Sequence, residues 1–443
     1  MMELWTVLYW VYGFVFVVIF LSATAHQLLG IRRYYINFLL KLFAFGQKRV
    51  ERKRVSSDQD DSETSFSEFD QPALSFEQPR ALGIDEDNKG FHMDHVLEYV
   101  TAGMASIMED NVTKYFEPEE LPMWNLLSRT NDRAYEFVSA RLTVCWVVGF
   151  MVRYALLFPI RLIILTLGIP LFWLCMIVVG VFPNGQFKRW LNRKLVIFCF
   201  DFIAGSLSLV ATFHNTENAP KRGIAVANHT SPIDSVVLAT HNYYDMVGQK
   251  HTGLMGIFMR ALSHASTHIW FERSDEKDRS LVVERLKERV NSPDLPPILI
   301  FPEGVCVNNT SVMQFKKGTF EIASVIHPIA IRFDARFGDA FWWQDKFLHY
   351  VIHMMTSWAI VCNVWYLPPM TRYPEESAIA FANRVKAKIA RQGGMIDLSW
   401  DGFLKAQPPK KEWLMQQQQE FARHLHVDNT EEEDQLSTKE KDE

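Results

Sequence analysis

Cysteine is sparse in this chain of 443 residues, and none of the five cysteines stands in a C-x-x-C pair. A zinc ribbon needs such pairs and a secreted disulfide framework needs an even set, so the sequence predicts neither. An odd number of thiols instead fits a chain whose working part faces a reducing compartment. The sequence also has no fixed-period repeat and no Gly-x-Ser-x-Gly motif, so neither a repeat architecture nor a serine acyl-enzyme is indicated.

The sequence has little net charge. Its 46 Lys+Arg and 51 Asp+Glu give −5 at pH 7, and its mean hydropathy is −0.04, as in an ordinary soluble protein. The average conceals two acidic segments, since residues 55–79 contribute −7 and residues 427–443 contribute −6, which leaves +8 on the other 401 residues. A basic remainder suits an anionic bilayer surface and phosphorylated ligands, and no nucleic-acid partner is predicted.

Apolar residues are gathered in blocks long enough to meet a membrane. Residues 5–24 form an uncharged run of 20 residues, about the length that crosses ~30 Å of hydrocarbon. Eight basic residues and one acid follow in residues 31–54, which by the positive-inside rule places that side in the cytosol. Residues 31–46 alternate basic with aromatic or aliphatic side chains, and this pattern predicts an amphipathic helix on the bilayer.

A second apolar region covers residues 142–182 and is interrupted at residues 158–161, which include Pro159. Its two pieces, of 17 and 21 residues, predict a helical hairpin that returns to the side it left. Arg153 is costly in a spanning helix, so a shallow or re-entrant hairpin is the alternative to a spanning one. In both cases the chain after residue 185 lies in the cytosol.

Beyond Gly223 short apolar runs alternate with polar helical stretches. The runs predict strands at 223–227, 268–271, 297–301 and 328–333, and the polar stretches predict helices at 232–240, 276–290 and 319–326. This alternation indicates an α/β fold, a sheet flanked by helices. The sequence is accordingly divided into a membrane anchor with a basic amphipathic segment (1–54), a disordered acidic linker (55–90), a connecting helical region (91–140), a hydrophobic membrane hairpin (141–194), the α/β domain (195–406) and a polar acidic tail (407–443).

The first predicted strand-to-helix turn carries His229 and Asp234. With Ser231 as the N-cap and Pro232 at the first helical position, His229 stands in the loop and Asp234 in the first helical turn. The carboxylate can then fix the imidazole tautomer and stabilise its protonated form, as a general base requires. Ser231 and Asp234 also have the spacing of a capping box, which needs no catalysis, so spacing alone leaves both interpretations open.

Further polar residues stand at the neighbouring strand ends. Arg273 follows the second strand, Glu303 and Gly304 end the third, and Lys316 and Lys317 precede the next helix. A guanidinium can bind an anion through two parallel hydrogen bonds, and the free N–H groups of a helix N-terminus attract phosphate. Together with the His/Asp pair, these residues predict a site for a phosphorylated substrate at one edge of the sheet.

These motifs resemble a known family. Asn-His-x4-Asp, Phe-Glu-Arg, Phe-Pro-Glu-Gly and His-Pro-Ile-Ala-Ile stand in the order of the four blocks of the glycerolipid acyltransferases, within residues 195–400. Longer strings, among them WFERSDEKDR, NNTSVM, FKKG-x-FE and VWYLPPMTR, are similar to the glycerol-3-phosphate acyltransferases 3 and 4 of the endoplasmic reticulum. The His-x4-Asp block alone indicates only the acyltransferase superfamily, whereas the longer strings indicate the glycerol-3-phosphate acyltransferases 3 and 4.

The resemblance implies acyl transfer from long-chain acyl-CoA, a co-substrate, to the sn-1 hydroxyl of glycerol 3-phosphate, the first step of phospholipid and triacylglycerol synthesis, without cofactor or metal. By matching positions, His229 would deprotonate the hydroxyl and Asp234 would orient His229. The remaining implied contacts are to phosphate from Arg273 with Lys316 or Lys317, and to glycerol from Glu303 and Gly304.

The resemblance further implies the endoplasmic-reticulum membrane, contact with membrane lipid and a catalytic domain in the cytosol. It permits a move to lipid droplets and leaves the oligomeric state open. One position departs from the family pattern, because Val305 stands where the family usually has Thr after Phe-Pro-Glu-Gly. Val305 lacks the hydroxyl that a threonine could offer to a substrate.

Three other functions compete with this interpretation. A lysophospholipid acyltransferase shares the His-x4-Asp block and differs in its acceptor, lysophosphatidate or lysophosphatidylcholine. A membrane metalloenzyme is suggested by the His264-x3-His268 and His349-x3-His353 spacings, but such sites need further histidines and carboxylates. A non-enzymatic membrane scaffold would have no need for polar residues at several strand ends.

Overall fold

The computed structural model describes residues 31–60, 113–119, 125–127, 140–250, 252–266, 268–271, 276–290, 292, 295–344 and 346–402. The predicted membrane run at 5–24, the linker from residue 61 and the tail at 407–443 therefore lie outside the described residues. Arg273 also lies outside them.

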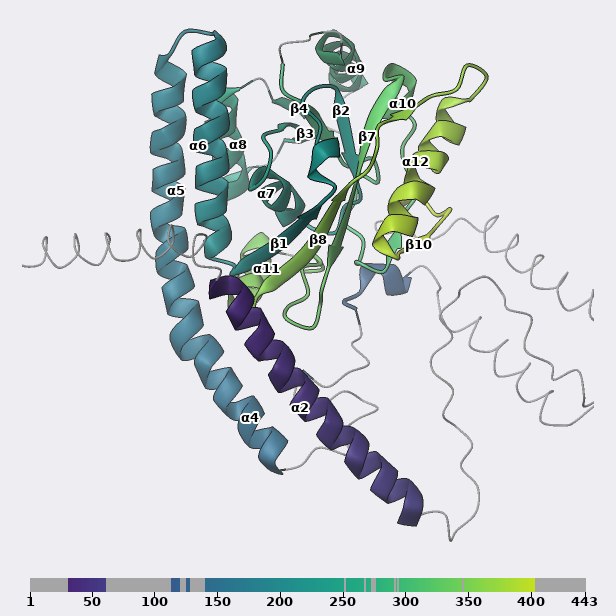
Figure 1. Cartoon of the computed structure of the whole chain (residues 1–443). Helices are drawn as coiled ribbons and strands as arrows, with labels where there is room; N and C mark the ends of the chain where they lie inside the picture. Colours follow the sequence, from purple (N-terminus) through teal and green to yellow (C-terminus); the bar gives the residue numbers. More distant parts are fainter. Residues whose placement is uncertain are drawn as a thin grey trace, which may run out of the picture.

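A mixed sheet forms the centre of the α/β domain (Figure 1). Its strands run in the order β1-β8-β7-β2-β5-β3-β4, and β9 pairs with β7. Neighbouring strands are parallel except that β8 and β9 run antiparallel to β7. The strands are β1 Leu209–His214, β2 Ile224–Ala227, β3 Asp245–Gln249, β4 Ile269–Phe271, β5 Ile298–Ile300, β7 Val325–Phe333, β8 Ile360–Tyr366 and β9 Met370–Thr371, and a separate parallel pair joins β6 Ser311–Val312 to β10 Ile396–Asp397.

Helices cover both faces of this sheet. Alternate residues of β2 point to opposite faces, so Ala225 and Ala227 pack in the core with α7 and α11, whereas Ile224 and Val226 pack with α9, α10 and α12. All four residues of β2 are buried, as in a strand covered on both sides. The helices are α7 Ile233–Ala239, α8 Gly253–Ala265, α9 Glu276–Val290, α10 Gly318–Ile322, α11 Phe347–Thr356 and α12 Ala378–Gly393. The predicted α/β fold is confirmed.

The apolar region does not turn where the sequence predicts. Helix α4 (Ala140–Met151), the π-helical segment η4 (Val152–Leu157) and α5 (Phe158–Val181) form one unbroken rod, and the chain reverses only after Val181, before α6 (Gln186–Gly205) (Figure 1). Pro159 stands inside this continuous helix, where it lacks the N–H of a regular helical hydrogen bond. The wider π turn before it, closed by the Phe158 N–H donating to the Arg153 carbonyl, keeps the helix continuous.

Two arginines in this rod face the α/β domain. Arg161 is buried and donates to the carbonyl of Met355 in the last turn of α11 and to those of Ser357 and Trp358 just after it. Arg153, also buried, donates to the Thr356 carbonyl over 3.2 Å. The last carbonyls of a helix lack partners within the helix and attract cations. The charge that made Arg153 costly in a spanning helix is thus satisfied by protein.

The outer side of the rod is apolar. Val144, Val148 and Met151 are exposed on α4, as are Leu156 and Ile160 further along. Among the described residues, the run Ala140–Val181 is long and apolar enough to cross a membrane, which is compatible with membrane association.

The basic segment forms a long helix, α2 (Ile31–Asp60), that runs beside α4 in Figure 1. Its Ile36, Leu39 and Phe43 are buried in a cluster with Phe337 and Trp358 of the α/β domain. The predicted helix over residues 31–46 is therefore present, with one face on protein. Residues 55–60, expected as the start of a disordered linker, belong to α2, whose second half is rich in helix-favouring Lys, Arg and Glu.

Candidate active site

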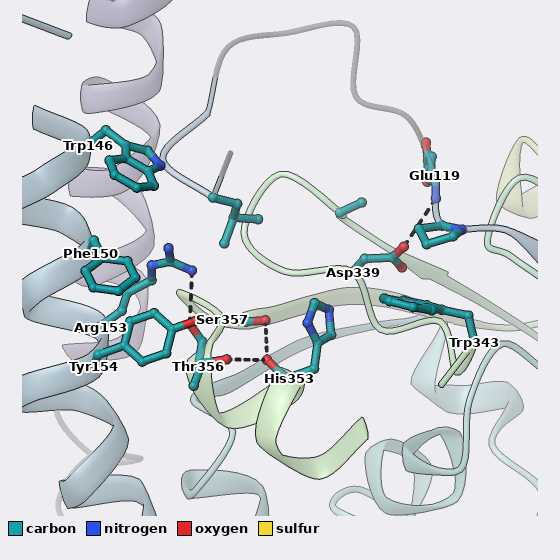
Figure 2. A pocket seen from close by; sticks show the side chains of 13 residues that line it. Glu119, Trp146, Phe150, Arg153, Tyr154, Asp339, Trp343, His353, Thr356 and Ser357 are labelled. Carbon is teal, nitrogen blue, oxygen red and sulfur yellow. Dashed lines mark hydrogen bonds between the residues drawn. The ribbon is translucent and has the colours of Figure 1, made fainter. Parts of the chain in front are cut away.

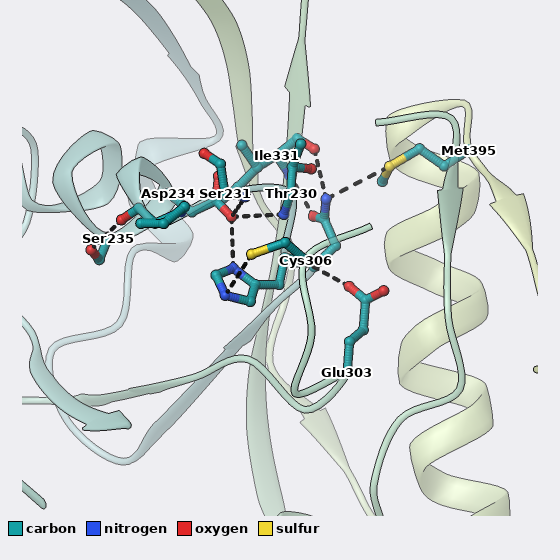
Figure 3. A network of polar contacts seen from close by, with 11 residues as sticks. Thr230, Ser231, Asp234, Ser235, Glu303, Cys306, Ile331 and Met395 are labelled. Carbon is teal, nitrogen blue, oxygen red and sulfur yellow. Dashed lines mark hydrogen bonds and ion pairs between the residues drawn. The ribbon is translucent and has the colours of Figure 1, made fainter. Parts of the chain in front are cut away.

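His229 stands in the loop between β2 and α7, at the carboxyl end of a central strand. Its Nδ1 lies 2.9 Å from Asp234 Oδ2 (Figure 3). The Asp234 side chain is fully buried, whereas 20% of the His229 side chain remains exposed. The carboxylate therefore holds Nδ1, and Nε2 is the ring nitrogen that does not contact it.

Asp234 also organises the start of its helix. Its Oδ2 accepts hydrogen bonds from the Thr230 N–H over 2.8 Å and the Ser231 N–H over 2.9 Å. The bond to Ser231 is the return bond of a capping box. The other bond of a capping box is missing, because the helix has Pro232 and not the predicted Ser231 as its N-cap and makes no side-chain cap bond. The catalytic interpretation stays a prediction. The helix begins at Ile233, one residue later than predicted.

Glu303 supports the same loop from the neighbouring strand end. Its Oε1 accepts from the His229 N–H over 2.7 Å, and its Oε2 accepts from the Met313 N–H over 2.8 Å. Burial raises the pKa of Glu303 to about 8, although both N–H bonds oppose the rise. The structure thus gives Glu303 a positioning role beside the predicted contact with glycerol, which stays a prediction.

Gly304 closes the turn that presents Glu303. Its N–H donates to the Phe301 carbonyl over 3.2 Å, and its φ of +70° lies in the region that favours glycine. The Phe301 ring stacks on the His229 imidazole, with 4.3 Å between centroids. The Phe-Pro-Glu-Gly string thus packs its first residue on His229 and turns back at its last.

Cys306 is a neighbour of His229 that the sequence analysis missed. Its Sγ lies 3.5 Å from His229 Nε2, and its position two residues after Gly304 was the available signal. Burial lowers the pKa of His229, but Cys306 and the Asp234 carboxylate raise it by more, so this pKa lies well above its ordinary value.

Of the residues predicted to bind phosphate, the structure describes Lys316 and Lys317 but not Arg273. The Lys316 N–H donates to the Pro302 carbonyl over 3.0 Å, which fixes Lys316 beside the Phe-Pro-Glu-Gly turn. The Lys317 ammonium is exposed and pairs with Glu321 over 3.0 Å. Helix α10 ends at Ile322, four residues before the predicted end, because β7 begins at Val325. Roles for these lysines and for Arg273 stay predictions.

The NNTSVM string has a structural use. Asn308 Nδ2 donates to the Lys114 carbonyl over 2.8 Å, and Asn309 Nδ2 donates to the Phe333 carbonyl over 2.7 Å. These amides join the loop after Cys306 to residues 113–119 and to β7. Among the residues that the structure describes, no group of three or more His, Cys, Asp or Glu side chains could hold a metal ion.

Known proteins are similar to this chain in sequence. A family model described as "Acyltransferase" matches residues 210–332. "Glycerol-3-phosphate acyltransferase 3-like" of Danio rerio is 46% identical over 435 residues, covering 96% of this chain and 98% of the relative. "Glycerol-3-phosphate acyltransferase 4" of Homo sapiens is 45% identical, covering 89% of each chain, and "Glycerol-3-phosphate acyltransferase 3" of Xenopus laevis is 44% identical, covering 94% of each.

A solved structure is also similar. It is the 1-acyl-sn-glycerophosphate acyltransferase PlsC from Thermotoga maritima, with a TM-score of 0.41 and 14% identity over 56% of this chain and 95% of that one.

Proposed function

Since the chain belongs to the glycerol-3-phosphate acyltransferase 3 and 4 family, we propose that it transfers a fatty acyl group from acyl-CoA to the sn-1 hydroxyl of glycerol 3-phosphate, giving lysophosphatidic acid and CoA. The observation that carries this proposal is the contact between His229 Nδ1 and the buried Asp234 carboxylate. It leaves Nε2 to act on a substrate hydroxyl.

In the proposed reaction, neutral His229 accepts the proton of the hydroxyl at Nε2 as the oxygen attacks the thioester carbonyl. Asp234 stabilises the imidazolium that forms, as a buried carboxylate does for a catalytic histidine. The tetrahedral intermediate then collapses, the C–S bond breaks, and the imidazolium returns its proton to the CoA sulfur. A positioned base of this kind contributes roughly 10²–10⁴ in rate.

Glu303 contributes by fixing the backbone of His229 through Oε1. Arg273 binds the phosphate in this proposal, with Lys316 and Lys317 adding positive charge at the same turn. The acyl donor in this proposal is long-chain acyl-CoA, and the apolar rod α4–η4–α5 supports a site close to membrane lipid because it is long and apolar enough to enter a bilayer. The proposed location is the endoplasmic-reticulum membrane, with the catalytic domain in the cytosol.

An acceptor assay tests the proposal against a lysophospholipid acyltransferase. Membranes containing the wild-type chain receive acyl-CoA with labelled glycerol 3-phosphate, lysophosphatidate or lysophosphatidylcholine in parallel. We expect glycerol 3-phosphate to be acylated and the other two to react far more slowly. Consumption of lysophosphatidate without consumption of glycerol 3-phosphate would overturn the proposal.

A further inference from the structure

A cavity of about 420 Å³ lies apart from the proposed catalytic residues (Figure 2). One wall is formed by Trp146 and Phe150 of α4 with Arg153 and Tyr154 of η4. The opposite side includes Glu119, and none of His229, Asp234, Glu303 or Cys306 lines the cavity. Its volume falls in the range of ordinary small-molecule sites.

The cavity has opposite charges on opposite walls. Arg153 lies among the aromatic rings of the helical wall, whereas Glu119 and Asp339 lie together across the cavity, beside Trp343 (Figure 2). The Asp339 carboxylate is held in place by the N–H groups of Glu119 and Phe341. A ligand that fills this space therefore meets a cation at one end and carboxylates with an aromatic ring at the other.

Several buried side-chain nitrogens in the wall lack partners. Within the part of the chain that the structure describes, Arg153 Nε, Trp146 Nε1 and His353 Nε2 are buried without a hydrogen-bond partner. Arg153 is only 6% exposed. Leaving such groups unpaired is costly, and each calls for an explanation. Because these nitrogens are covered by protein atoms, a ligand with acceptor oxygens supplies the missing partners once the Arg153 and Trp146 side chains turn toward the cavity.

The cavity borders the apolar side of the rod. Phe150 and Tyr154 are 38% and 43% exposed, and Val147, Val148 and Met151 are exposed around them. A ligand whose polar part enters the cavity can therefore leave apolar tails along α4, where lipid would lie if the rod enters a bilayer.

We propose that this cavity binds the head group of a zwitterionic glycerophospholipid. The phosphate lies against Arg153 and Trp146, whose donors it satisfies. The ammonium lies toward Asp339 and Glu119, with Trp343 offering an aromatic face. The two carboxylates repel a bare phosphate monoester, so the site prefers phosphocholine or phosphoethanolamine head groups.

Direct lipid binding tests this site. The purified full chain in dodecylmaltoside is titrated with dihexanoyl phosphatidylcholine, dihexanoyl phosphatidic acid or inorganic phosphate, and bound lipid is counted by native mass spectrometry. We expect saturable binding of one phosphatidylcholine, about tenfold tighter than phosphatidic acid, the effect of one charge-assisted contact. No saturable phosphatidylcholine binding, or equal affinity for phosphatidic acid or free phosphate, would overturn the proposal.

Matched variants locate the binding. Trp146→Phe removes only the indole donor and should weaken phosphatidylcholine binding about tenfold, whereas Trp190→Phe, at an exposed position of α6, should leave it unchanged. Asp339→Asn should remove the preference over phosphatidic acid. Unchanged affinity in folded Trp146→Phe contradicts the assignment. No acyl donor is present, so the result is independent of the proposed acyl transfer.

Discussion

At the residue scale, His229 is held through its Nδ1 atom and through its backbone N–H. Asp234 holds Nδ1 over 2.9 Å while it also binds two backbone N–H groups of the loop. Glu303 fixes the backbone of the same histidine. The imidazole is thus positioned from both ends before any substrate arrives, which lowers the cost of reaching a reactive geometry.

The raised pKa of His229 predicts an acidic limb in the pH–rate profile. Only the neutral imidazole can accept a proton, so kcat/KM for glycerol 3-phosphate should fall as pH drops through a pKa above 6.5. Asp234→Asn removes a carboxylate that raises this pKa, so the limb should move to lower pH while the plateau falls. If the acidic limb of the variant stays at the wild-type pH, Asp234 does not raise the pKa that controls the rate.

The same shift links stability to pH. The folded chain binds the His229 proton more tightly than the unfolded chain does. This contribution to the free energy of unfolding is therefore full below about pH 6.5, the unfolded value, and is lost as pH rises through the folded pKa.

Cys306 tests whether the acyl group is transferred directly. Its Sγ contacts His229 Nε2 at 3.5 Å, and in a covalent route this thiol would be acylated first. Direct attack does not need the thiol, so Cys306→Ala should keep acyl transfer within about tenfold of wild type, roughly the effect of one weak hydrogen bond. A loss as large as that in His229→Ala, with an acylated Cys306 peptide from the wild type, would establish the covalent route instead.

Val305 is the position that departs from the family pattern. Its side chain packs with the cluster of Tyr115, Val307, Met313 and Leu398 and lies close to Gly402. Because this side chain is engaged in packing, Val305→Thr should change the rate of acyl transfer by less than about tenfold, roughly one neutral hydrogen bond. A larger gain, measured in the same membranes, would show that a hydroxyl at this position reaches the substrate.

At the element scale, the rod α4–η4–α5 is attached to the α/β domain by its arginines. Arg161 satisfies carbonyls at the carboxyl end of α11, and its guanidinium also donates to the Ser208 hydroxyl over 2.9 Å. The sequence indicated a break because it contains a proline and a charge in an apolar run. A π turn accommodates the proline, and the carboxyl end of α11 accommodates the charge. The sequence around residues 158–161 predicts neither the π turn nor the contact with α11.

This attachment predicts a stability effect. Arg161→Met replaces the guanidinium with an unbranched apolar side chain and leaves several buried carbonyls unpaired. We expect the free energy of unfolding to fall by about 3 kcal/mol. The thermal unfolding midpoint in detergent should fall by roughly 6–12 °C. Arg189→Met, at an exposed position of α6, is the matched control and should stay near wild type. An equal midpoint for both variants would contradict the attachment.

At the scale of the whole molecule, the sequence predicted the parts of the site that local spacing determines. The His229/Asp234 pair follows from a strand, a loop and a helix start in series, and the structure has all three. Glu303 accepts from the backbone of His229 because two strand ends meet in space. Asn308 contacts residues 113–119, which lie nearly two hundred positions away in the sequence. Periodicity carries no information on such pairs.

Some of the basic residues outside the two acidic segments have a structural role. The basic segment is a helix with one face on the α/β domain, and Arg32 donates to the Leu209 carbonyl at the start of β1. Part of the positive remainder thus holds the molecule together, while exposed Lys41 and Lys48 stay available to an anionic surface.

The most direct measurement of the central claim is the rate of acyl transfer to glycerol 3-phosphate by purified His229→Ala beside wild type. The account predicts that kcat falls by at least about 10², the contribution of a positioned base, while KM for glycerol 3-phosphate and the thermal midpoint change little. A folded His229→Ala enzyme that keeps kcat within tenfold of wild type would contradict it.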